Sequence, residues 1–253
     1  MWRFSITPPS SNTSRTTSTL VPWPSSTPPA SHPGFEHGLN RSRLMRPHTS
    51  PSLPAPSGPP QLLRASIFPY TDPKSFAALS MVLEGVGVSA YLGDAASITN
   101  KDYLTAAGSI LTTEARHASW VSFTVNEGSP WPGALDVPLD FNQVYSLAST
   151  FITSYPSTNL ALLVKAFPAL TFSPMTAMSG DEITVSYKGT ADNVFMDFYT
   201  GLSQMSAHIS NGKVIIPNDL EGTVYAVVST NSTAATDNTT KAGPAVFVFP
   251  VSF

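Results

Sequence analysis

The stretch from Lys74 to Ile98 runs for 25 residues without a proline and is apolar on nearly every face. Immediately before it, Thr71-Asp72-Pro73 supplies a capping residue and then a proline, which is how many helices begin. The apolar side chains recur at helical spacing, so the stretch predicts one long helix. The residues that carry this spacing are Phe76, Leu79, Leu83, Val86 and Ala90.

A second stretch of the same kind follows a turn at Thr99-Asn100 and runs from about Lys101 to Val125. Turn-forming residues from Glu127 to Gly133 end it. Asp140 is placed to cap a third helix over residues 141–153. The sequence therefore predicts an antiparallel helical hairpin followed by a third helix.

Beyond Pro156 the chain changes to short runs of β-branched and aromatic residues separated by turn residues. Their regular spacing predicts a small β-sandwich of the immunoglobulin-like type, and the whole chain is expected to be α+β. Asn211-Gly212 predicts a β-hairpin between two of these strands. The predicted strands are 183–187, 194–198, 213–216, 223–228 and 245–249.

The first 60 residues hold 13 of the 24 prolines, so we expect residues 1–66 to be a disordered arm. Up to Arg64 the arm is basic, with six Arg against the single acid Glu36, whereas the rest has seven Lys and Arg against fifteen acids. The arm contains no uninterrupted apolar stretch of the kind a secretion signal needs. The predicted organisation is this arm, a helical segment at 67–168 and a β-sandwich at 169–253.

Composition excludes several classes of protein. The chain has no cysteine, which rules out disulfides and cysteine-based zinc sites. A net charge of −3 argues against a nucleic-acid partner. No stretch reaches the roughly 20 consecutive apolar residues of a membrane span, so none is expected.

The carboxylates of the two predicted helices carry the chemistry. Glu84 is the only charged residue between Lys74 and Asp94, and a lone carboxylate there is costly to bury unless something pairs with it. In the second helix, Glu114 and His117 form a Glu-x-x-His pair one turn apart. Glu84 lies about as far before the turn as Glu114 lies after it, so both stand at the same height. One Glu plus a Glu-x-x-His is half of the ligand set of a di-iron or di-manganese site.

Other interpretations of the same residues stay open. Glu114 and Arg116 can be solvated, His117 can be a hydrogen-bonded core histidine, and Glu84 can pair with a nearby hydroxyl group. The run Gly85–Ala90 formally fits the G-x-G-x-x-A dinucleotide fingerprint, but that motif needs a preceding strand. Small residues inside a helix more simply let a neighbouring helix approach closely.

Between Phe68 and Pro168 the sequence resembles the fungal ferritin-like proteins of stress response and late sexual development, which are related to plant desiccation proteins. The matching stretches are Leu83–Gly93, Ala106–Leu111, Glu114–Ala118 and Pro130–Gly133. The resemblance implies a four-helix ferritin-like bundle, an accompanying C-terminal β segment and an extracellular or cell-wall location. It implies Glu84, Glu114 and His117 as metal ligands, with iron or manganese as the metal. Two sequons in one loop, at Asn231 and Asn238, agree with a secreted glycoprotein.

A ferritin-like bundle needs a second hairpin with its own Glu and Glu-x-x-His, and residues 1–66 offer only Glu36 followed by His37. We therefore expect one copy of the chain to form only half of a bundle. Either the chain is truncated, with an unrelated amino-terminal segment, or two copies pair as a homodimer and rebuild the bundle. In the first case the chain is a non-enzymatic secreted or wall-associated protein with an extracellular partner. In the second it is a di-metal redox protein that oxidises iron or removes peroxide. Whether it is an enzyme stays open.

Overall fold

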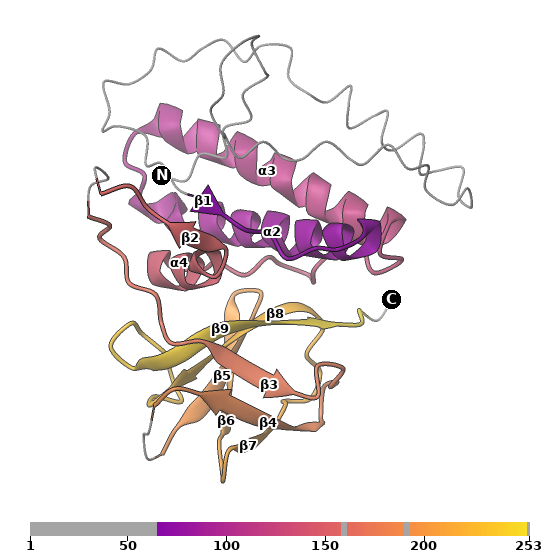
Figure 1. Cartoon of the computed structure of the whole chain (residues 1–253), viewed down its shortest axis with the longest axis vertical. Coiled ribbons are helices and arrows are strands. Elements are labelled where there is room, and N and C mark those ends of the chain that lie inside the picture. The colour runs from indigo at the N-terminus through magenta and orange to yellow at the C-terminus, as the bar shows by residue number, and fades with distance from the viewer. Residues whose placement is uncertain (1–64, 158–160, 190–192, 252–253) are drawn as a thin grey trace. The chain divides into compact units, whose positions relative to one another are not determined.

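The computed structural model of the chain describes residues 65–157, 161–189 and 193–251. The arm predicted for residues 1–66, including Glu36, lies almost wholly outside the described residues. In the described part three α-helices precede two antiparallel β-sheets, so the predicted α+β class is confirmed (Figure 1).

The predicted helical hairpin is present. Helix α2 (Pro73–Asp94) is followed by the short 3₁₀ turn η1 (Ala95–Ser97), and α3 (Lys101–Thr124) returns alongside α2 (Figure 1). Asp72 caps α2 as expected, because its carboxylate accepts a hydrogen bond from the Ser75 backbone N–H at 2.9 Å. Asn100 caps α3 in the same way by accepting from two backbone N–H groups.

Helix α4 (Phe141–Ser149) begins at the predicted cap, where the Asp140 carboxylate accepts from the Gln143 backbone N–H at 2.8 Å. It ends at Ser149 rather than at residue 153, because the next residues form a strand. That strand, β2 (Ile152–Ser154), pairs antiparallel with β1 (Ala65–Ser66). Of the two compact units of the chain, one includes both short strands, and the other includes the helices and the remaining strands.

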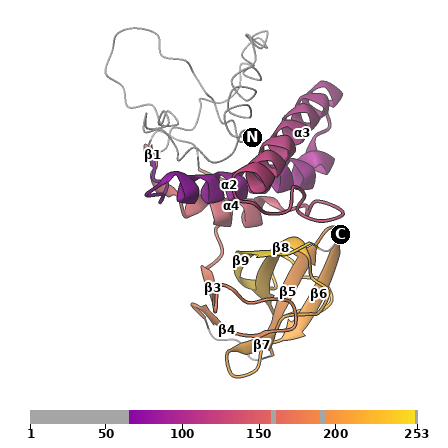
Figure 2. The same cartoon turned by 90° about the vertical axis from the view of Figure 1, so that its right-hand side faces the viewer.

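The remaining strands form a three-stranded sheet in the order β3-β4-β7 and a four-stranded sheet in the order β6-β5-β8-β9 (Figure 2). Side chains from both sheets fill one hydrophobic core, in which Ile183, Phe198 and Phe247 are almost completely buried. The strands are β3 (Leu170–Ser173), β4 (Glu182–Tyr187), β5 (Phe195–Thr200), β6 (Ser203–His208), β7 (Lys213–Ile215), β8 (Gly222–Ser229) and β9 (Thr240–Phe249).

The hairpin predicted at Asn211-Gly212 is wrong in its partners. Both residues have positive φ and form a tight turn, as such a pair favours, but the turn closes only the isolated bridge from Ser210 to Lys213. Strand β6 before the turn pairs with β5, whereas β7 after it pairs with β4 in the other sheet. The chain therefore crosses between sheets at this turn.

Helix α2 packs on the four-stranded sheet through a second hydrophobic cluster. Tyr225 of β8 lies with Val86 of α2 and with Leu139, which precedes α4. The Ser89 hydroxyl group also donates a hydrogen bond to the Tyr225 hydroxyl oxygen at 3.3 Å. These contacts place residues 69–150 and 161–253 in one compact unit. The domain boundary between residues 168 and 169 stays a prediction.

One described helical stretch, Pro73–Ser97, is long and apolar enough to span a membrane. Length and composition are weak grounds for a span, because core helices of soluble proteins also satisfy them. The absence of a membrane span therefore stays a prediction.

Candidate functional site

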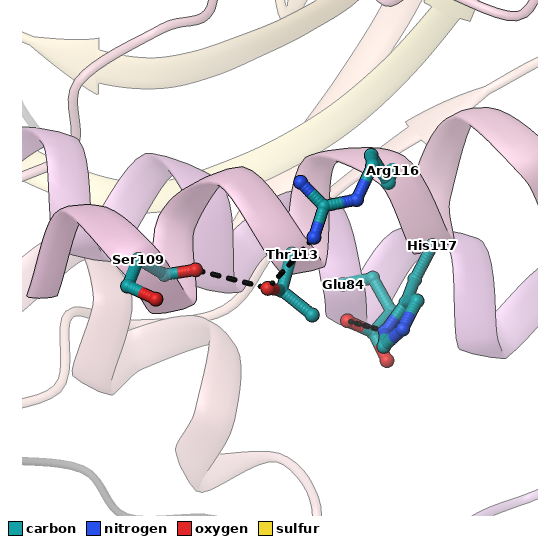
Figure 3. Close-up of polar contacts among 5 residues, drawn as sticks. All are labelled: Glu84, Ser109, Thr113, Arg116 and His117. Atoms are coloured by element: carbon teal, nitrogen blue, oxygen red, sulfur yellow. Dashed lines mark hydrogen bonds and ion pairs between the residues drawn. The ribbon is translucent and has the colours of Figure 1, made fainter. Parts of the chain in front are cut away.

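The hairpin brings Glu84 and His117 together. The His117 Nδ1 atom lies 3.4 Å from the Glu84 Oε2 atom, across the seam between α2 and α3 (Figure 3). Both side chains are partly exposed, His117 at 43% and Glu84 at 31%. The antiparallel run of the helices explains the meeting, because equal steps from the turn bring residues to the same height.

Glu114 lies one turn before His117 on α3 and faces α2 at Gly87. Its Oε2 atom is buried and has no hydrogen-bond partner among the described residues. A buried carboxylate oxygen without a partner costs free energy, because it has lost its water and gained nothing in return. Glu84, Glu114 and His117 form a cluster between α2 and α3. Within it, the Glu114 carboxylate is the group that a proton or a bound cation would stabilise most.

Burial and the charges of neighbouring side chains set the protonation of Glu114 and His117. Burial raises the pKa of Glu114 to about 7, repulsion from Glu84 adds to the rise, and attraction to His117 opposes it. The hydrogen bond to Glu84 raises the pKa of His117 above its ordinary value, while burial opposes that rise. Near neutral pH the cluster can therefore take up or release a proton.

The simpler interpretations of these residues are partly correct. The exposed Arg116 points away from Glu84 and donates to the Thr113 hydroxyl oxygen at 3.1 Å (Figure 3). Glu84 contacts the imidazole ring of His117 rather than a hydroxyl group. Glu114 is not simply solvated, because its Oε2 atom is buried.

The chemistry of this donor set suits a hard divalent metal such as iron or manganese, which prefers carboxylate oxygen with imidazole nitrogen. The orphaned Glu114 Oε2 atom is consistent with a missing ligand interaction. Yet among the described residues no group of three or more His, Asp or Glu side chains is arranged to hold a metal ion. Glu84, Glu114 and His117 thus have the chemistry of half a di-metal ligand set, and their role as metal ligands stays a prediction.

Sequence reasoning missed the close contact between Gly87 and the Glu114 carboxylate. From the sequence, Gly87 is only one of several small residues in the run Gly85–Ala90. The structure places this run inside α2, as a helix and not a nucleotide-binding turn. The available signal was a glycine in the middle of a helix, a position that glycine destabilises unless close packing requires it.

Comparison with known proteins adds a match to one domain family. The model of the ferritin-like domain matches residues 50–127, a range that includes α2, α3 and all three candidate ligands. A search of curated proteins found no match. Helical hairpins that carry a Glu and a Glu-x-x-His are the repeating half of ferritin-like di-metal bundles, so the match and the geometry agree. Residues 50–127 therefore carry a ferritin-like domain.

Proposed function

We propose that the chain is a ferritin-like protein of stress response or sexual development that works without enzymatic activity of its own. The observation that carries this proposal is the incomplete ligand set. The described residues supply one Glu from α2 and one Glu-x-x-His from α3, and no group of three that is arranged to hold a metal ion. A single hairpin of this kind provides half of what two-metal chemistry needs.

In this proposal the β-strands form an immunoglobulin-like interaction module. The strand orders β3-β4-β7 and β6-β5-β8-β9 support it, because they correspond to A-B-E and C′-C-F-G when the seven strands are lettered A, B, C, C′, E, F and G in chain order. Sandwiches of this architecture are common in cell-surface proteins and present loops for binding.

A secreted or wall-associated location is supported by the loop between β8 and β9. Both sequons of the described part, at Asn231 and Asn238, fall in this loop, and Asn238 is exposed. The location, the stress or developmental role and an extracellular partner rest otherwise on the resemblance to the fungal family.

Binding of the purified full chain to insoluble fungal cell-wall material tests the proposal. We expect the chain to bind, and we expect Glu114→Ala to fold and bind as well as wild type, because the helices act only as scaffold. Lys213→Ala, which removes the exposed ion pair to Glu182 at 2.7 Å, is a matched surface control on the β-strands. No binding by wild type, or binding lost in Glu114→Ala alone, would contradict the proposal.

A second candidate function is a di-metal redox protein whose site two copies rebuild as a homodimer. The buried Glu114 Oε2 atom without a partner among the described residues favours it. So do the large apolar side chains that α3 exposes at Tyr103, Ile110 and Phe123. A two-fold axis would bring two equal half-sets of ligands together. Bound iron or manganese would supply the redox chemistry for iron oxidation or peroxide removal.

The oligomeric state of the full chain separates the two candidates. The second requires a dimer in solution that Mn²⁺ stabilises, and Glu84→Ala should abolish that stabilisation. Light scattering after size-exclusion chromatography, with and without Mn²⁺, measures it. A monomer whose mass and thermal stability do not respond to Mn²⁺ would exclude the second candidate.

A further inference from the structure

Gly87 lies opposite the Glu114 carboxylate, and the space that its missing side chain leaves is filled by that carboxylate. A Cβ atom built on Gly87 would overlap the Glu114 Oε2 atom and would lie 2.8 Å from the Glu114 Cδ atom. Such distances are shorter than real Cβ contacts. A side chain at position 87 and the Glu114 carboxylate therefore cannot both occupy the positions that the structure gives them.

Two other helical glycines, Gly85 in α2 and Gly108 in α3, have no such overlap. A Cβ atom on Gly85 would come no closer than 4.0 Å to the Tyr225 hydroxyl oxygen, and one on Gly108 would meet nothing within 4 Å. Among these three glycines, only Gly87 would bring an added Cβ atom against the Glu114 carboxylate. The overlap involves the far end of a flexible side chain, so an alanine there would displace the carboxylate rather than the backbone.

We propose that Gly87 is a positioning residue, which leaves the space that keeps the Glu114 carboxylate between the two helices, near Glu84 and His117. This inference deepens the second candidate function and rests on it only for the identity of the ligand, a divalent iron or manganese ion. The steric part stands on the geometry alone. Gly87 touches no substrate; it acts by allowing Glu114 to remain buried.

Carbodiimide labelling of carboxyl groups in the folded full chain, read by mass spectrometry, tests the steric part. Buried carboxylates react slowly, so we expect Glu114 labelling to rise several-fold in Gly87→Ala. In Gly108→Ala, the matched control, Glu114 labelling should stay at the wild-type level. The fully buried Asp197 should stay protected in both variants, which excludes general loosening. Unchanged labelling of Glu114 in Gly87→Ala would overturn the inference.

A double-mutant comparison keeps the inference testable if Gly87→Ala folds poorly. Any fall in Tm caused by Gly87→Ala should disappear in a Glu114→Ala background, because the overlapping carboxylate is then gone. If Gly87→Ala lowered the Tm equally in the wild-type and Glu114→Ala backgrounds, the inference would be overturned, because the added methyl group would then clash with atoms other than the Glu114 carboxylate.

Mn²⁺ titration of the same variants, followed by electron paramagnetic resonance, tests the link to the metal. If wild type binds Mn²⁺, Gly87→Ala should weaken binding at least tenfold and Gly108→Ala should leave it unchanged. Equal binding by all three proteins would overturn this link. If wild type binds no Mn²⁺, the second candidate function fails, and labelling alone decides the role of Gly87.

Discussion

Glycine serves two different purposes within α2. At Gly87 it leaves room for the end of a side chain, which can move. At Gly93 it faces the backbone of Leu139, whose carbonyl carbon would lie 2.7 Å from an added Cβ atom. The Leu139 backbone N–H also donates to the Ser89 carbonyl oxygen at 3.1 Å, so this segment is held against α2 and cannot retreat easily.

We therefore predict opposite effects of alanine at two helical glycines. Gly93→Ala should lower the free energy of unfolding by about 1–3 kcal/mol, as overpacking against a fixed backbone does. Gly108→Ala should raise it by about 0.5–1 kcal/mol, because alanine favours the helix and nothing obstructs it. Urea denaturation followed by circular dichroism measures both. A stabilised Gly93→Ala variant would contradict the packing described for this helix.

The candidate site could be predicted from the sequence as far as helical geometry reaches. Counting residues outward from one turn was enough to place Glu84 beside the Glu-x-x-His of the next helix. It could not show that Glu114, rather than Glu84, has the buried oxygen without a partner among the described residues, because burial depends on side chains from both helices.

At the scale of elements, helices with strong local signals were predicted and strands with weak ones were not. Asp140 precedes α4 with a glutamine three residues later, and the two form a capping box that the structure retains. Strand β6 reads Ser-Gln-Met-Ser-Ala-His, which lacks the β-branched residues typical of strands, so it was missed. Its pairing with β5 is a tertiary effect that local sequence does not encode.

The cap at α4 gives a prediction for a single element. Asp140→Ala should lower the free energy of unfolding by about 1 kcal/mol, because the Gln143 backbone N–H then loses its acceptor. Asp140→Asn keeps a capping oxygen and should cost much less. Chemical denaturation of the three proteins at pH 7 compares them. Equal losses in both variants would mean that the charge of Asp140, and not its cap, stabilises α4.

At the scale of the whole molecule, acids whose pKa values are raised by burial link stability to pH. Burial raises the pKa of Asp94 to about 6, with repulsion from Asp140 contributing, and it also raises the pKa values of Asp136, Asp140 and Asp197. Each of these four carboxyl groups thus holds its proton to higher pH in the folded chain than in the unfolded chain, Asp94 up to about pH 6. Stability from these groups is complete below their unfolded pKa, near 3.8, and is lost as the pH rises through the folded values.

We expect the full chain to have a higher Tm at pH 5 than at pH 7.5. Asp94 lies at the last residue of α2, where the helix dipole also disfavours a negative charge. Asp94→Asn should therefore stabilise the chain at pH 7.5 by about 0.5–1 kcal/mol, an amount already reduced for solvent screening. It should have little effect near pH 4. Thermal unfolding across this range provides the test, and an Asp94→Asn effect that does not vary with pH would contradict it.

We propose that Glu84, Glu114 and His117 are half of a di-metal ligand set, and that one copy of the chain binds no metal through them because the described residues supply no second half. Native mass spectrometry of the full chain after anaerobic exposure to ferrous iron tests it most directly. We expect the monomer to carry no iron at its folded charge states, in wild type and in Glu84→Ala alike. A monomer that binds two iron ions, and loses them in Glu84→Ala, would contradict the claim.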